Sequence, residues 1–163
     1  MIDYVKIENT LKQLDTAFQN SLTDPYLPIL LSKTAVIEFS GWIEDSLDQM
    51  LHDYLNNHIC EPTIIKYIKE QIKTNYGFQY EKNVLKIISI TIGAYHLENI
   101  LDKINVTLFQ SILDQYSRIR NTAAHTHIVG TTNTFNAPST VLNDFIRIKP
   151  IFANIEKEMQ SLP

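Results

Sequence analysis

The sequence predicts an all-α protein, folded as an antiparallel helical bundle with a long second helix and a kinked C-terminal helix. Apolar residues recur every three or four positions along most of the 163 residues, which is the spacing of one face of an α-helix. Only four glycines and six prolines interrupt the chain, and no stretch alternates apolar and polar residues as a half-buried strand does. The length fits a single domain over residues 1–163 with one hydrophobic core.

The first half of the chain is expected to form two helices. Five apolar residues in phase predict the first helix, over about the first twenty residues: Ile7, Leu11, Leu14, Phe18 and Leu22. Thr23 and Asp24 suit the N-cap of the next helix, and Pro25 and Pro28 are tolerated in or before its first turn. Eight residues keep the helical period in this long second helix, with no breaker stronger than Gly41: Leu31, Ala35, Phe39, Ile43, Leu47, Met50, Leu51 and Tyr54.

Shorter helices should follow. Pro62 suits the first turn of a third helix, which Gly77 ends. A fourth helix runs to Gly93, where the chain either bends or breaks before the period resumes. Asn105 is expected to cap a further helix, which has four apolar residues on one side: Leu108, Ile112, Tyr116 and Ile119.

The chain should end in a loop followed by a last helix. Residues 127–140 mix Gly, Pro, Asn, Ser and Thr without any period, which predicts a functional or mobile loop. Apolar residues then stay in helical phase from Val141 to Leu162, on both sides of Pro150. This pattern predicts one kinked helix rather than two unrelated ones.

Composition limits the classes of function. The net charge of −4 argues against tight nonspecific wrapping of nucleic acid, although local basic sites remain compatible with it. The N-terminus lacks the features of a secretory signal, and no apolar run is long enough to span a membrane. Cys60 is the only cysteine, so no intramolecular disulfide can form. We therefore expect a cytoplasmic protein without membrane association.

One segment, "RIRNTAAHTH" at residues 118–127, concentrates two arginines, two histidines and an asparagine. Arginine offers a permanent charge and a flat fork of donors that suits phosphate, and histidine titrates near neutral pH. Together they suit phosphodiester chemistry without a metal or a cofactor. The alternative is structural, because Arg and His near a helix C-terminus also stabilise its dipole and bond its last carbonyls.

Helix geometry limits which of these side chains can act together. Five residues correspond to about 140° of rotation, so Arg120 and His125 diverge on an ideal helix. Arg118 and His125, and likewise Arg120 and His127, are seven positions apart and lie on nearly one face. Either the helix ends between Arg120 and His125, or a second subunit completes the site.

The segment "RNTAAH", from Arg120 to His125 at the end of a late helix, resembles the Arg-x4-6-His signature of the HEPN superfamily. Three other segments resemble the RiboL-PSP-HEPN branch of that superfamily: "AVIEFSGWIEDSLDQML", "YGF" and "APSTVLNDFIRI". The resemblance covers most of residues 30 to 160.

The resemblance implies a bundle that dimerises and forms a composite cleft from two copies of the motif. Many HEPN proteins are metal-independent endoribonucleases, in which the RNA 2′-hydroxyl attacks the adjacent phosphate and leaves a 2′,3′-cyclic phosphate. Arg120 would then hold the scissile phosphate, and His125 would act as general acid or base. Asn121 would position the arginine or the substrate.

Three further residues are secondary candidates. HEPN domains often place an acidic residue on an earlier helix facing the motif, which here indicates Glu38; its alternative is a solvent-facing or ion-paired glutamate. Arg118 either contacts a flanking RNA phosphate or is a surface charge. His127 stands where a toxin subgroup carries a tyrosine that its antitoxin modifies with AMP, so the resemblance does not extend to that control. His127 either assists proton transfer or only covers the start of the loop that follows the motif.

The leading hypothesis is a homodimeric HEPN ribonuclease, a toxin or defence effector that acts on RNA and is neutralised by an antitoxin protein. One alternative is a HEPN-like module that binds nucleotide or RNA without cleaving it, and another is a structural helical adaptor. Aromatic side chains are able to stack on the bases of single-stranded RNA, but a place in the core or the dimer interface is the preferred interpretation, so none is assigned to the substrate: Trp42, Tyr76, Phe78, Tyr80, Tyr95 and Tyr116.

Overall fold

The computed structural model describes residues 2–126 and 134–162, and every regular element in these ranges is helical, with no strand. The all-α prediction is therefore confirmed. In chain order the elements are α1 (Tyr4–Asn20), α2 (Leu27–His58), α3 (Pro62–Thr74), the π-helical turn η1 (Tyr80–Leu85), α4 (Lys86–Ile92), α5 (Ala94–Leu101), α6 (Val106–His125) and α7 (Pro138–Gln160).

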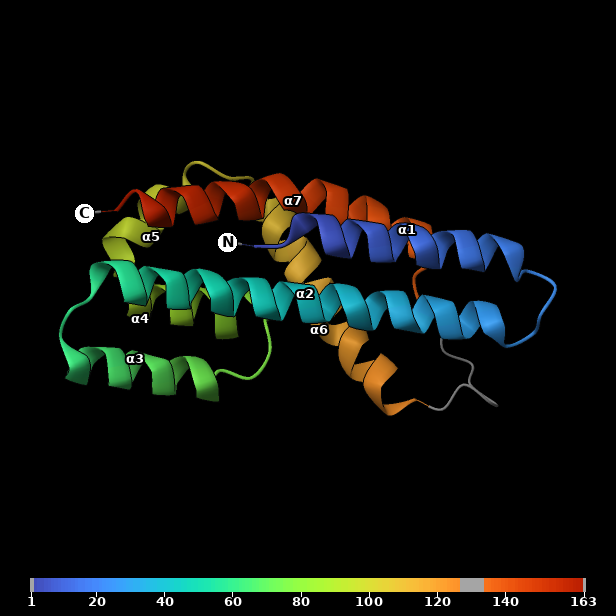
Figure 1. Cartoon of the computed structure of the whole chain (residues 1–163), viewed down its shortest axis with the longest axis horizontal. Helices are drawn as coiled ribbons and strands as arrows, with labels where there is room; N and C mark the ends of the chain where they lie inside the picture. The colour runs from blue at the N-terminus through green and yellow to red at the C-terminus, as the bar shows by residue number, and fades with distance from the viewer. Residues whose placement is uncertain (1, 127–133, 163) are drawn as a thin grey trace.

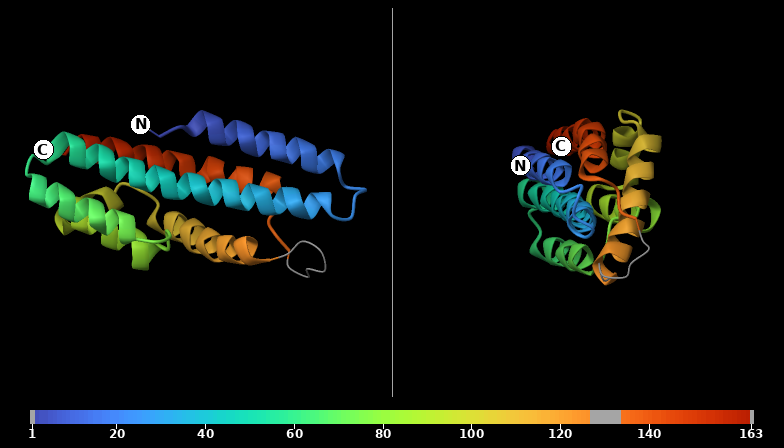
Figure 2. Two further views of the ribbon diagram at one scale, coloured as in Figure 1. Left: turned by 60° about the horizontal axis from the view of Figure 1, so that its bottom comes forward. Right: turned by 90° about the vertical axis from the view of Figure 1, so that its right-hand side faces the viewer.

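Three long helices, α1, α2 and α7, lie along the long axis of the molecule and pack on one another (Figure 1). Helix α1 runs antiparallel to both α2 and α7, whereas α2 and α7 run in the same direction. Helix α6 crosses α2, and α3 and α6 lie on the opposite side of α2 from α1 (Figure 2). The 32-residue α2 is thus the common support of both sides of the bundle.

An aromatic cluster forms the centre of the core where α2, α6 and α7 meet. The ring of Phe39 packs edge-on against Tyr116 at a centroid distance of 4.7 Å. Trp42 contacts Phe145 at 5.1 Å and Phe152 at 4.9 Å. Because all these rings are buried, they fix how α6 sits on α2, and α6 carries the arginine and histidine motif.

The N-cap of α2 is Tyr26, which makes no side-chain capping bond, so the prediction that Thr23 or Asp24 is the N-cap is wrong. Asp24 instead bonds the turn that leads into the helix. The Asp24 carboxylate accepts hydrogen bonds from the backbone N–H groups of Tyr26 at 2.7 Å and Leu27 at 2.8 Å. Pro28 lies in the first turn, where a missing N–H costs nothing. Pro62 has the same role at the start of α3, and Asn105 caps α6 by accepting from the N–H of Leu108.

At Gly93 the helix breaks rather than bends: α4 ends just before it and α5 begins just after it. Its φ of +86° lies in the left-handed region, which ends α4 and sets α5 in a new direction. The sequence did not predict η1, the π-helical turn that precedes α4.

Helix α7 continues through Pro150, as the phase of its apolar residues predicted. It begins at Pro138, so the predicted loop over residues 127–140 ends earlier than expected. Residues 134–137 have no regular structure, and the rest of the predicted loop before them, 127–133, lies outside the described residues. Among the described residues, no helix combines the length and the apolar character that crossing a membrane requires.

Candidate functional site

Helix α6 carries the motif without interruption as far as His125. The helix therefore does not end between Arg120 and His125, and their side chains leave it about 140° apart. Arg118, Asn121 and His125 are exposed, whereas Arg120 is half-buried. Of the two arrangements that the sequence left open, only completion by a second subunit would bring Arg120 and His125 together.

Arg120 points toward α2 and contacts Glu44. It stands four residues after Tyr116 and three before Ala123, both fully buried, so it continues the buried face of α6 at its edge. Its Nη2 donates to Oε2 of Glu44 at 3.2 Å. The side chains are 41% and 28% exposed, respectively, so solvent reaches the pair.

Burial raises the pKa of the Glu44 carboxyl above its usual value. The Arg120 charge opposes this rise, and the carboxylates of Asp48 and Asp45 add to it. Burial also raises the pKa of Asp48, with His52 opposing and Asp45 adding. Negative charge is thus crowded on this part of α2, and the Arg120 guanidinium compensates part of it.

The end of α6 is capped by a residue outside the motif. The Lys33 ammonium, from α2, donates to the backbone carbonyl of Thr126 at 2.8 Å. The Thr126 hydroxyl donates to the carbonyl of Thr122 at 2.7 Å. These contacts bond two carbonyls near the end of α6. Arg120 binds Glu44 and lies before the last turn, whereas His125 is the basic residue of the last turn, where the alternative of a favourable contact with the helix dipole still applies.

Two grooves flank Arg120. The first, here called the loop groove, has a volume of about 220 Å³ and lies between the segment after α3 and α6. Its polar lining consists chiefly of Gln79, Lys82, Ser117, Arg120 and Asn121. The second, here called the acidic groove, has a volume of about 330 Å³ and is lined by the carboxylates of Glu44, Asp45 and Asp48 together with Lys73.

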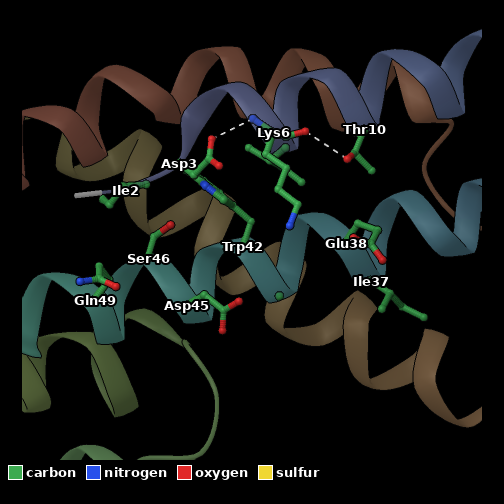
Figure 3. Close-up of a pocket in the computed structure, with 12 residues that line it drawn as sticks. Ile2, Asp3, Lys6, Thr10, Ile37, Glu38, Trp42, Asp45, Ser46 and Gln49 are labelled. Carbon is green, nitrogen blue, oxygen red and sulfur yellow. Dashed lines mark hydrogen bonds between the residues drawn. The ribbon is translucent and has the colours of Figure 1, made fainter.

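Glu38 lies elsewhere. It lines a groove of about 510 Å³ whose residues come from α2, from α1 and from the residues just before α1. Figure 3 shows Glu38 beside Lys6, which reaches from α1 toward α2. Because α1 and α6 lie on opposite sides of α2 (Figure 2), Glu38 does not face Arg120. Sequence reasoning missed Glu44, which is the glutamate of α2 that contacts Arg120.

The helical phase of α2 contains the information that identifies Glu44. This glutamate stands four residues after Ser40 and three before Leu47, and both of these are buried. A charged residue in phase with a buried stripe is expected to have a partner on the neighbouring helix. Arg120 is the corresponding interruption of the buried stripe on α6.

The remaining candidates add little to the described site. His127 lies outside the described residues. Within residues 2–126 and 134–162, no group of three His, Cys, Asp or Glu side chains is arranged to hold a metal ion. Comparisons of the chain with family models, with curated proteins and with solved structures gave no significant match.

Proposed function

We propose that this chain is a metal-independent endoribonuclease that cleaves RNA in a cleft between two copies of α6. The observation that carries the proposal is the position of Arg120, which is held by Glu44 at the wall of a polar groove and does not cap its own helix. The resemblance of "RNTAAH" to the HEPN signature adds the reaction class. An exposed His125 at the end of the same helix supplies the group that transfers protons.

The contact between Arg120 and Glu44 suits phosphate binding. A guanidinium has five N–H donors, and the hydrogen bond to Glu44 uses the Nη2 end. The remaining donors are suited to two oxygens of one phosphate. An ion pair this exposed contributes about 0–1 kcal/mol to stability, so its main effect is to fix the direction of the guanidinium.

The proposed reaction is an internal transesterification. A base removes the proton from the RNA 2′-hydroxyl, and the oxygen attacks the adjacent phosphorus. The bond from phosphorus to the 5′-oxygen breaks, and an acid protonates that oxygen. His125 gives or takes these protons, and Arg120 stabilises the extra negative charge of the transition state. The products are a 2′,3′-cyclic phosphate and a 5′-hydroxyl.

The divergence of Arg120 and His125 on one helix favours a homodimer, in which Arg120 of one copy and His125 of the other form one active site. Asn121, on the wall of the loop groove, would help to orient the substrate, and the exposed Arg118 would contact a flanking phosphate. We extend the proposal to a cytoplasmic toxin or defence effector. Free ribonuclease activity harms its host, so this role requires a neutralising antitoxin protein.

The test is cleavage of single-stranded RNA by the purified chain in the presence of EDTA, with analysis of the product ends. We expect cyclic-phosphate ends, lost in Arg120→Ala and in His125→Ala. His96→Ala, on α5 and away from the motif, is the matched histidine control and should cleave normally.

The same assay distinguishes the alternatives. RNA binding without cleavage would indicate a binding module instead of an enzyme. The loop groove suits such a module, because Arg120 and Lys82 give it two cations for one carboxylate. Neither binding nor cleavage would leave a structural adaptor.

A further inference from the structure

The segment between α3 and η1 exposes an aromatic ring beside Arg120. Tyr76 is 84% exposed, more than any other large hydrophobic residue described, so it lies outside the core that was one of its two expected places. It lines both the loop groove and the acidic groove. Phe78, two residues later, is buried, so the segment is anchored by one ring and presents the other to solvent.

The backbone under Tyr76 is held by the side chain of Asn83. Asn83 Nδ2 donates to the carbonyl of Tyr76 at 2.9 Å and to Oδ1 of Asn75 at 3.2 Å. Asn83 Oδ1 accepts from the N–H of Gln79 at 3.2 Å. Gly77, with a φ of +91°, makes the reversal that these three bonds enclose. The exposed ring therefore stands on an ordered turn, which lowers the entropy cost of binding against it.

The turn is also fixed relative to Arg120. The N–H of Tyr80 donates to Oδ1 of Asp114 on α6 at 2.9 Å, six positions before Arg120 on the same helix. The π-helical turn η1 then places adjacent side chains differently: Asn83 is buried in the turn, whereas Lys82 is exposed. Wide turns of this kind are frequent at functional sites.

Charge separates the two grooves. The loop groove combines Lys82 and Arg120 with a single carboxylate, Glu44, so cations exceed anions by one. The acidic groove combines Lys73 and Arg120 with the carboxylates of Glu44, Asp45 and Asp48, so anions exceed cations by one. The loop groove is therefore electrostatically the more favourable of the two for a phosphate backbone.

From this arrangement we infer that Tyr76 and Lys82 form a subsite for the nucleotide next to the scissile phosphate of single-stranded RNA. The base stacks on the Tyr76 ring, and the phosphate of that nucleotide contacts the Lys82 ammonium. Stacking on an aromatic ring tolerates every base, so this subsite selects unpaired nucleotides rather than a sequence. The inference rests on the proposed function for the place of the scissile phosphate at Arg120.

The test measures RNA binding without cleavage. In a His125→Ala background, a fluorescent single-stranded RNA is titrated with protein, and its anisotropy gives the Kd. Tyr76→Ala should weaken binding about tenfold or more, and Tyr76→Trp should retain it. Lys82→Ala should weaken binding and lower the slope of log K against log salt by about one phosphate contact. The matched controls Tyr67→Ala, on α3, and Lys86→Ala, on α4, should bind normally.

An RNA with one abasic nucleotide, moved stepwise along the strand, locates the stacked base. At one position the abasic RNA should bind Tyr76→Ala and its parent equally, because the interaction is already absent. The subsite is overturned if the parent binds no RNA, or if Tyr76→Ala and Lys82→Ala both bind as tightly as the parent.

Cleavage by chains with native His125 separates the two proposals. Normal cleavage by wild type, Tyr76→Ala and Lys82→Ala, with unchanged binding, overturns the subsite and leaves the nuclease. Tyr76-dependent binding without cleavage by wild type overturns the nuclease and leaves the subsite.

Discussion

Arg120 and Glu44 stand 76 residues apart in the sequence, yet their side chains meet at 3.2 Å between Nη2 and Oε2. Each residue replaces an apolar side chain at the edge of a buried helical stripe, one on α6 and one on α2. The core cluster around Phe39 and Tyr116 fixes the crossing of these helices. The direction of the guanidinium is therefore set by the packing of the whole bundle.

Removing Glu44 should impair cleavage more than folding. In Glu44→Ala the guanidinium loses its fixed partner, and we expect kcat/KM for RNA to fall about tenfold, because orientation of a transition-state contact is lost. Glu44→Gln keeps an acceptor oxygen and should recover part of the rate. Urea unfolding should change by less than about 1 kcal/mol in both variants.

Glu38→Ala is the matched control on the same helix and should cleave like the wild type, since Glu38 lies in the groove against α1. A faster Glu44→Ala enzyme would contradict the positioning role. It would mean that Glu44 competes with the RNA phosphate for Arg120.

The raised pKa of Glu44 also predicts a pH effect on stability. Burial is its main cause, so the folded state holds this proton to a higher pH than the unfolded state does. The contribution of Glu44 to the free energy of unfolding is therefore full at a pH below the ordinary pKa of a glutamate. It is lost as the pH rises through the raised pKa. Glu44→Gln, which has no proton to lose there, should flatten this part of the curve.

The measurement is the free energy of unfolding in urea at steps between about pH 4 and pH 7. Asp48→Asn should flatten the curve in the same sense, because burial raises the pKa of Asp48 too. Curves for Glu44→Gln and the wild type that run parallel would refute the prediction.

A buried hydrogen bond behind the motif should contribute to the stability of the bundle. The hydroxyl of Tyr116 donates to Oδ2 of Asp144 at 2.9 Å, and it accepts from Nδ2 of Asn136 at 3.4 Å. Burial raises the pKa of this hydroxyl, so it remains protonated. Tyr116→Phe leaves the Asp144 oxygen without this donor, which should cost about 1–3 kcal/mol in urea unfolding.

Tyr67→Phe removes a hydroxyl from an exposed ring and should change stability by less than about 0.5 kcal/mol. Equal losses in Tyr116→Phe and Tyr67→Phe would show that the bond to Asp144 contributes nothing net.

The long helices could be predicted from the sequence, because the spacing of apolar residues is local information. Helices α1, α2, α6 and α7 follow that spacing. The sequence did not decide the chain direction at Gly93, since the choice between bend and break depends on the packing of α4 and α5. Arg120 and His125 were identifiable from their types and spacing. Helical phase places Glu44 on the buried stripe of α2, but its partner depends on which helix faces α2. The role of Asn83 depends on which carbonyls the turn after α3 exposes, so no signal in the sequence identified it.

One substitution, glycine to alanine, should have opposite effects at two positions. Gly41 lies inside α2, and a Cβ there would meet no atom within 4 Å. Gly41→Ala should therefore stabilise the fold by about 0.5–1 kcal/mol through the entropy of the unfolded chain. Gly93 has a φ of +86°, so Gly93→Ala should destabilise by about 1 kcal/mol or more.

Thermal unfolding of the two variants beside the wild type gives the signs directly. A stabilised Gly93→Ala variant would contradict the left-handed backbone conformation that separates α4 from α5.

Mixing two inactive variants tests whether two chains share one active site. If Arg120 of one copy acts with His125 of the other, a dimer of Arg120→Ala with His125→Ala has one intact site and one that lacks both groups. An equimolar, exchanged mixture contains about half mixed dimers, each with one of two sites intact, so about a quarter of the wild-type cleavage rate should return. The mixture is compared with each variant alone at the same total concentration. No recovery, in a sample whose mixed dimers are verified by differently tagged chains, would rule out this pairing across the dimer.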